Sequence, residues 1–204
     1  MILEVIPGGA ARPVPDAADD GQWVLRARAG DVAAREALFR RHLRPLRQRV
    51  FRLLGPDAET DDVVQEAFLR AFEGLSRLAE PRAFGAWLST IAVHLVDRRL
   101  RRRRLLRRLG FVPPGDGLDA IEAVASSGVS PAMAAEARSI YTLLDRLPPE
   151  ARVAFLLRRL EGMTVPEISL HMGLSERTVK RRIALAEERL GSILEIDIDG
   201  EGEG

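Results

Sequence analysis

The sequence predicts an all-α protein made of two small helical domains joined by a flexible linker, the second of them a helix-turn-helix domain. From Trp23 onward, apolar residues recur at the spacing of one face of an α-helix, and no segment alternates with the period of a strand. The one extended interior stretch without that period, residues 110–131, is rich in proline and glycine, as linkers between domains are.

These patterns divide the chain into successive segments. Residues 1–21 hold prolines, glycines and aspartates without an apolar period, and we expect a disordered tail there. Residues 22–109 form the first domain, residues 110–134 the linker, and residues 135–194 the second domain. The acidic, glycine-rich segment 195–204 is expected to be a second disordered tail.

The composition is that of a globular protein without a dominant charge. Apolar residues make up 46% of the 204 residues, and 31 basic residues against 30 acidic ones leave a net charge of +1. Any strongly charged surface must therefore be local. Cysteine is absent, which excludes disulfides and thiolate chemistry and fits a reducing compartment. With no signal peptide and no apolar run of membrane-spanning length, we expect a cytoplasmic protein without membrane insertion.

Capping residues mark the helices of the first domain. Asp31, after Gly30, is placed to cap a helix that ends before Gly55. A further helix opens at residues 60–62, with aspartates in the first turn where the helix dipole favours acids, and runs to about Leu75. One face of this helix is apolar. The other face carries Asp62, Gln65, Glu66, Leu69 and Glu73.

The capping residues of the second domain predict a helix-turn-helix. Thr164 and Glu167 have the spacing of a capping box, in which each side chain satisfies a backbone N–H at the start of a helix. Gly173 suits the left-handed backbone of the turn, and Ser175 is placed to cap a second helix that runs to about Leu190. An ordinary helical hairpin with a solvated basic face is the alternative interpretation.

The second helix of this motif has the side chains of a DNA-recognition helix. Val179, Ile183 and Ala186 face inward, while short polar and basic groups gather on the outer side of its N-terminal turns. Arginine reads guanine edges, and lysine or hydroxyl groups hold phosphates. We expect DNA contacts from Ser175, Glu176, Arg177, Thr178, Lys180, Arg181 and Ala184.

An arginine-rich run ends the first domain. Its members are Arg98, Arg99, Arg101, Arg102, Arg103, Arg104, Arg107 and Arg108, with only Asp97 against them in the same stretch. Phe84 and Trp87 precede the run, and aromatic rings beside a basic track are typical of a surface for single-stranded nucleic acid. The alternative is a solvated helix surface in an arginine-biased proteome, since Lys180 is the only lysine in the chain.

Two sets of sequence runs match a known family in order and spacing. The first domain contains DDVVQEAFLRAF at 61–72 and FGAWLSTIA at 84–92, and the second contains LDRLPPE at 144–150, FLLR at 155–158 and RTVKRRI at 177–183. These runs resemble bacterial RNA polymerase sigma factors of the extracytoplasmic-function group, over roughly residues 23–190. The resemblance implies a factor that binds core RNA polymerase and directs promoter recognition, DNA melting and transcription initiation.

The resemblance also implies three binding surfaces. The clamp helices of the polymerase would dock on Asp62, Gln65, Glu66, Leu69 and Arg70. A loop at 78–84 would capture a flipped base of the promoter's minus-ten element, at a cost in unstacking that other contacts must offset. The minus-ten contacts are expected from Arg82, Phe84, Trp87, His94, Asp97, Arg98 and Arg101. The recognition helix would read the minus-thirty-five element, and an anti-sigma factor is a further partner that the family allows.

Two residues depart from the family's pattern near these surfaces. His94 stands where asparagine is usual, and Arg181 stands where a small residue is usual. Because both lie near the expected DNA surfaces, the promoter sequence cannot be copied from relatives.

Other classes of protein explain less of the sequence. A stand-alone helix-turn-helix regulator accounts for the second domain only. An enzyme is not expected, because His42, His94 and His171 lie on different helices without metal-ligand spacing and no glycine-rich phosphate loop is present. We therefore expect no catalytic residues, no metal, no cofactor and no small-molecule substrate. A sigma mimic that only sequesters an anti-sigma factor would not need the basic surfaces.

Overall fold

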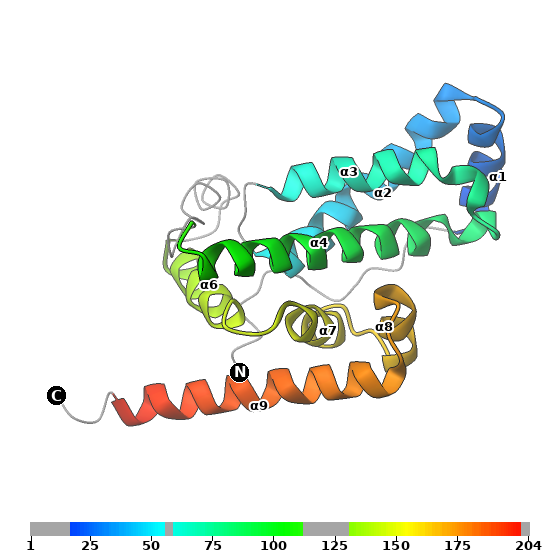
Figure 1. Cartoon of the computed structure of the whole chain (residues 1–204). Helices are drawn as coiled ribbons and strands as arrows, with labels where there is room; N and C mark the ends of the chain where they lie inside the picture. The colour runs from blue at the N-terminus through cyan, green and yellow to red at the C-terminus, as the bar shows by residue number, and fades with distance from the viewer. Residues whose placement is uncertain (1–16, 56–58, 112–130, 201–204) are drawn as a thin grey trace.

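The computed structural model describes residues 17–55, 59–111 and 131–200, and the regular secondary structure of these residues is helical, without a strand (Figure 1). The first domain contains α1 (Ala17–Arg28), α2 (Val32–Leu54), α3 (Thr60–Glu73), the 3-10 turns η2 (Leu75–Arg77) and η3 (Pro81–Ala83), and α4 (Phe84–Arg108). The second domain contains α6 (Pro131–Leu144), α7 (Pro149–Arg159), α8 (Val165–Met172) and α9 (Glu176–Gly200). The predicted all-α fold with two helical domains is confirmed.

Local capping sets the helix boundaries of the first domain. The Asp31 side chain accepts a hydrogen bond from the backbone N–H of Ala34 at 3.2 Å, as the sequence predicts for an N-cap. Gly30 has a φ of 90°, a conformation that suits glycine and lets the chain reverse between α1 and α2. The apolar faces of the four helices then meet in one core, which includes Val24, Leu38, Val50, Val63, Phe68, Phe84, Leu88 and Val96.

The helix-turn-helix forms as predicted. Both hydrogen bonds of the Thr164–Glu167 capping box are present at the start of α8. Gly173 ends α8 with a φ of 64° and a ψ of 31°, the left-handed conformation that the turn requires. Ser175 Oγ accepts a hydrogen bond from the Thr178 N–H at 3.3 Å and so caps α9.

The two domains pack against each other. In Figure 1, α7 and α8 lie between α4 and α9, and they contact both helices. Arg152 of α7 is 2% exposed and donates to the backbone oxygens of Leu53 and Leu54 at 3.2 and 2.7 Å, which satisfies the C-terminal end of α2. The Tyr141 hydroxyl donates to the Arg52 oxygen at 3.1 Å. We call this packing of α7 and α8 against α2 and α4 the closed arrangement.

The segment boundaries differ from the predicted ones at three places. Residues 17–21 belong to α1 rather than to a disordered tail, because the buried Asp20 carboxylate binds His42 at 2.8 Å and Arg41 at 3.3 Å. Residues 131–134 begin α6 rather than ending the linker, and α9 continues to Gly200, beyond the predicted domain end at 194. The rest of the two tails and of the linker, residues 1–16, 112–130 and 201–204, lies outside the described residues. Within the described part of the chain, no helix combines the length and apolar character needed to cross a membrane.

Candidate nucleic-acid and polymerase interfaces

One exposed face of α3 carries the five side chains expected to bind the polymerase. Leu69 is apolar and still keeps 56% of its surface in solvent. Glu66 is partly exposed, and its Oε1 lies 2.6 Å from Arg70 and 2.8 Å from Arg98. The exposed polar members are Asp62, Gln65 and Arg70. An exposed leucine among charged and polar side chains suits a surface that another protein covers.

The loop between α3 and α4 is the predicted site for a flipped base. It runs through η2, the buried Leu78 and η3 before α4 begins at Phe84. Arg82 is exposed on η3, and its backbone N–H donates to the Glu80 side chain at 3.1 Å. Trp87 is half-buried, with its ring 3.3 Å from the position that a Cβ on Gly74 would occupy. The loop is therefore ordered by its own contacts, and Arg82 stands at its surface.

Phe84 does not lie at this surface. Its side chain is wholly buried, with its ring centroid 5.3 Å from that of His42, 6.2 Å from that of Phe72 and 6.3 Å from that of Trp87. A ring enclosed in this way offers no face to a base, so the prediction of a DNA contact from Phe84 is wrong for this structure. The signal was present in the sequence, because Phe84 and Leu88 are four positions apart on the apolar stripe of α4.

Carboxylates from other elements balance much of the arginine run. Arg98 binds Glu66 of α3 at 2.8 Å. Arg99 and Arg103 bind the two oxygens of Glu59, which precedes α3, at 2.8 and 3.0 Å. In the sequence only Asp97 opposes the run, because these acids lie 32–44 positions away from their partners. The run is thus partly a scaffold that fixes α4 to α3.

Three of the expected minus-ten residues lie on the side of α4 that faces the second domain. Arg101 bridges Asp97 and Glu150, each at 2.6 Å, and the hydrogen bond from Arg101 to Asp97 raises the pKa of the arginine. Asp97 Oδ1 is buried without a hydrogen-bond partner among the described residues. His94 Cε1 lies 3.7 Å from the position that a Cβ on Gly173 would occupy, so the turn of the helix-turn-helix touches α4 there.

The outer face of α9 is open to solvent. Val179, Ile183 and Ala186 are buried, as predicted, while the basic side chains of the N-terminal turns are exposed. Thr178 is half-exposed, and its hydroxyl lies 2.9 Å from that of Ser175 at the cap. The exposed members of the predicted set are Ser175, Glu176, Arg177, Lys180, Arg181 and Ala184. The structure therefore gathers the whole predicted set on one end of α9.

Comparisons with known proteins agree on one family for both domains. Residues 38–105 match the model described as Sigma-70 region 2, and residues 137–190 match the one described as Sigma-70, region 4. The RNA polymerase sigma factor NccH of Alcaligenes xylosoxydans xylosoxydans is 31% identical over 88% of this chain and 97% of its own length. The ECF RNA polymerase sigma-E factor of Escherichia coli strain K12 is 32% identical over 84% of this chain and 92% of its own.

This chain belongs to the extracytoplasmic-function sigma factor family. As a sigma factor it directs promoter recognition and transcription initiation, with RNA polymerase and promoter DNA as its partners. Its fold is also similar to that of CnrH in a complex with the cytosolic domain of CnrY, with a TM-score of 0.59 and 28% identity over 89% of this chain and 99% of that one. Sigma factors are initiation factors rather than enzymes.

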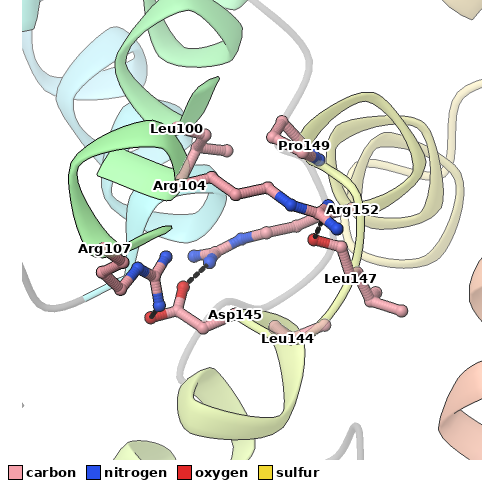
Figure 2. Close-up of a pocket in the computed structure, with 8 residues that line it drawn as sticks. All are labelled: Leu100, Arg104, Arg107, Leu144, Asp145, Leu147, Pro149 and Arg152. Atoms are coloured by element: carbon pink, nitrogen blue, oxygen red, sulfur yellow. Dashed lines mark hydrogen bonds and ion pairs between the residues drawn. The ribbon is translucent and has the colours of Figure 1, made fainter. Parts of the chain in front are cut away.

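In this sigma factor, charged side chains hold the two domains together near the end of α4. Figure 2 shows Asp145 between Arg107 of α4, at 3.1 Å, and Arg152 of α7. Arg104 donates to the backbone oxygen of Leu147 at 3.3 Å, from the other side of the same small pocket. Burial lowers the pKa of Arg152, and the Asp145 carboxylate offsets part of that effect.

A second contact between the domains was not predicted from the sequence. The Glu161 carboxylate, 1% exposed, follows α7 and accepts hydrogen bonds from Nε of Arg49 at 2.8 Å and of Arg52 at 2.5 Å. Nearby, His171 Nδ1 of α8 lies 2.8 Å from Thr90 Oγ1 of α4. Burial lowers the pKa of His171. No local sequence pattern predicts these contacts, because the residues of each pair lie 81–112 positions apart.

Proposed function

We propose that the sigma factor docks onto the clamp helices of core RNA polymerase through the outer face of α3. The observation that supports this most directly is Leu69, an apolar side chain that is 56% exposed between charged neighbours. Burying such a residue against a partner is favourable, and the charged side chains around it orient the approach.

We propose that the N-terminal end of α9 reads the minus-thirty-five element. Its support is the division of α9 into an inner apolar side and an outer basic side, with the Gly173 turn fixing the angle between α8 and α9. Arg177 is placed to read a base edge and Lys180 to hold a phosphate.

We propose that the minus-ten element is read by Arg82 and Trp87 at the loop and by His94, Asp97, Arg98 and Arg101 along α4. Arg82 and Arg98 are exposed in the closed arrangement. His94, Asp97 and Arg101 lie beside the second domain; His94 and Arg101 are exposed there, while the Asp97 side chain keeps only 14% exposure. We therefore expect that DNA can contact all of these residues together, Asp97 included, only when the closed arrangement opens.

We also propose that a protein partner controls this opening. CnrH, whose fold is similar over most of this chain, was solved with the cytosolic domain of CnrY. A partner of that kind, an anti-sigma factor that binds the two domains together, would keep the α4 surface covered.

A charge reversal on α3 tests the polymerase surface. The variant Asp62→Arg with Glu66→Arg should lose binding to core RNA polymerase in a pull-down, because it replaces two acids on the proposed docking face. Glu187→Arg with Glu188→Arg is the matched control, since both acids are exposed on α9, and Figure 1 shows α9 on the opposite side of α7 and α8 from α3. Helicity by circular dichroism should be the same for both variants. If the α3 variant still bound core RNA polymerase as wild type does, this face of α3 would not be part of the interface.

Two alanine variants test the recognition helix in the assembled holoenzyme. Arg177→Ala should relax base preference at one promoter position, by a factor that corresponds to about 1–3 kcal/mol. Lys180→Ala should weaken binding to all promoter sequences by a similar factor. It should also reduce the steepness of the plot of log affinity against log salt concentration by about one. The measurement is transcription or binding across a promoter library at several salt concentrations. Identical profiles for the two variants would contradict the division of roles.

A further inference from the structure

Arg28, in the last turn of α1, reaches the loop between α3 and α4. Its Nε donates to the Leu75 backbone oxygen at 3.0 Å, and a terminal nitrogen of the same guanidinium donates to the Leu78 oxygen. Both carbonyls belong to the stretch where the chain leaves α3, 47 and 50 positions from Arg28. Leu75 and Leu78 have buried side chains, so Arg28 satisfies backbone groups at the edge of the core.

The N-terminal half of α1 lies against the same loop. A Cβ added at Gly21 would come within 3.1 Å of Arg82 Cγ, so the α1 backbone lies directly beside the Arg82 side chain. In Figure 1, α1 stands at the end of the first domain where the chain turns from α3 into α4. Residues of α1 thus contact both the beginning and the end of the loop.

We propose that Arg28 is a positioning residue for the minus-ten loop. By holding two carbonyls of one turn, its guanidinium fixes the backbone that leads to Arg82, and so fixes the geometry in which the loop meets a flipped base. The inference rests on the proposed reading of the minus-ten element by this loop. It assigns a role to α1, which ends before residue 38, where the match to the region 2 model begins.

The chemistry of the contact requires arginine. A guanidinium presents its donors in a rigid planar fork, which can serve two carbonyls in one geometry. A lysine ammonium keeps the positive charge but is a single flexible point donor. Arg28→Lys therefore separates the role of the fork from the role of the charge.

The test uses holoenzyme assembled from core RNA polymerase and each sigma variant. The probe is a promoter fragment whose minus-ten strand is single-stranded, with each base substituted in turn, and affinity is measured over a salt series. Arg28→Ala and Arg28→Gln should reduce the preference for the best base at one position about tenfold, because two hydrogen bonds of ordinary strength are lost or weakened. The salt slope should stay the same, and Arg28→Lys should not restore the preference. Arg26→Ala is the matched control, since Arg26 lies on the same helix, is exposed, and pairs with Asp31 rather than with the loop.

Each other outcome overturns a defined part of the argument. A uniform loss for all bases with a lower salt slope, reversed by Arg28→Lys, would mean that Arg28 contacts a phosphate directly. Unchanged base preference in every variant would mean that the loop does not depend on Arg28. If Arg28→Ala fails to assemble with core polymerase, Arg28→Lys carries the test, because it is expected to assemble and still lose the preference. Absence of any minus-ten base preference in the wild-type holoenzyme would instead refute the proposed function of the loop.

Discussion

The substitution Glu161→Gln tests whether one buried carboxylate holds the two domains in the closed arrangement. The Glu161 side chain is 1% exposed and binds two arginines of the other domain, whose side chains keep 21% and 13% exposure. Removing one partner of a fully buried ion pair costs about 3–5 kcal/mol. Here the arginines remain partly solvated, Arg49 keeps its 2.5 Å hydrogen bond to Ser89, and glutamine retains an acceptor oxygen. We therefore expect a loss of about 2 kcal/mol, which lowers the ratio of closed to open molecules about 30-fold.

The assay is energy transfer between dyes on two introduced cysteines. The natural chain has no cysteine, so Leu25→Cys in α1 and Leu170→Cys in α8, both at exposed positions, give selective labelling. Glu161→Gln should lower the transfer efficiency, and it should do so without loss of helicity. Glu187→Gln is the control, because Glu187 forms an exposed ion pair with Arg159 inside the second domain, and such a pair contributes little. Equal transfer for wild type and Glu161→Gln would show that this carboxylate does not hold the domains.

Two further predictions concern stability and pH. Phe84→Ala should lower the free energy of unfolding by about 3–5 kcal/mol in chemical denaturation, because the ring is wholly buried among other aromatic rings; a loss below about 1 kcal/mol would contradict its place in the core. The closed arrangement should weaken as the pH falls below the ordinary histidine pKa of 6.5, because packing of α8 on α4 lowers the pKa of His171 and so favours its neutral form. Dye-pair measurements from about pH 8 to about pH 5 should show the closed fraction falling for wild type but much less for His171→Gln, and equal pH dependence in both would rule out His171 as the cause.

The parts of the fold that the sequence predicted are those fixed by neighbouring residues. The Thr164–Glu167 box, the left-handed Gly173 and the Ser175 cap each act over a few positions, so their spacing alone located the helix-turn-helix. In the same way, the helical spacing of the apolar residues of α9 predicted which side of this helix is buried. Leu69 was placed correctly on the polar face of α3, and its exposure there is what makes that face a candidate interface.

The parts that the sequence did not predict depend on contacts between distant segments. Asp20 lies in a stretch with the composition of a tail, yet it is buried in α1, where its carboxylate binds His42 and Arg41. Glu161 and Arg152 are charged residues that no apolar period would place inside a protein. The packing of the domains supplies both arginine partners of Glu161 and the two backbone oxygens that Arg152 binds. Helical period also left the role of Phe84 open, because an aromatic residue suits both a core and a stacking surface.

Two ion pairs between the domains, Arg101 with Glu150 and Arg107 with Asp145, limit where the chain can be cut into separately folded fragments. Like charges three and four positions apart repel one another on a helix, so the end of α4 gains stability from acids that the second domain supplies. A fragment that stopped at residue 111 would carry the basic run without these counter-charges, and its last helical turns would fray. A fragment boundary chosen from the linker alone would therefore remove contacts that stabilise the last turns of the longest helix of the first domain.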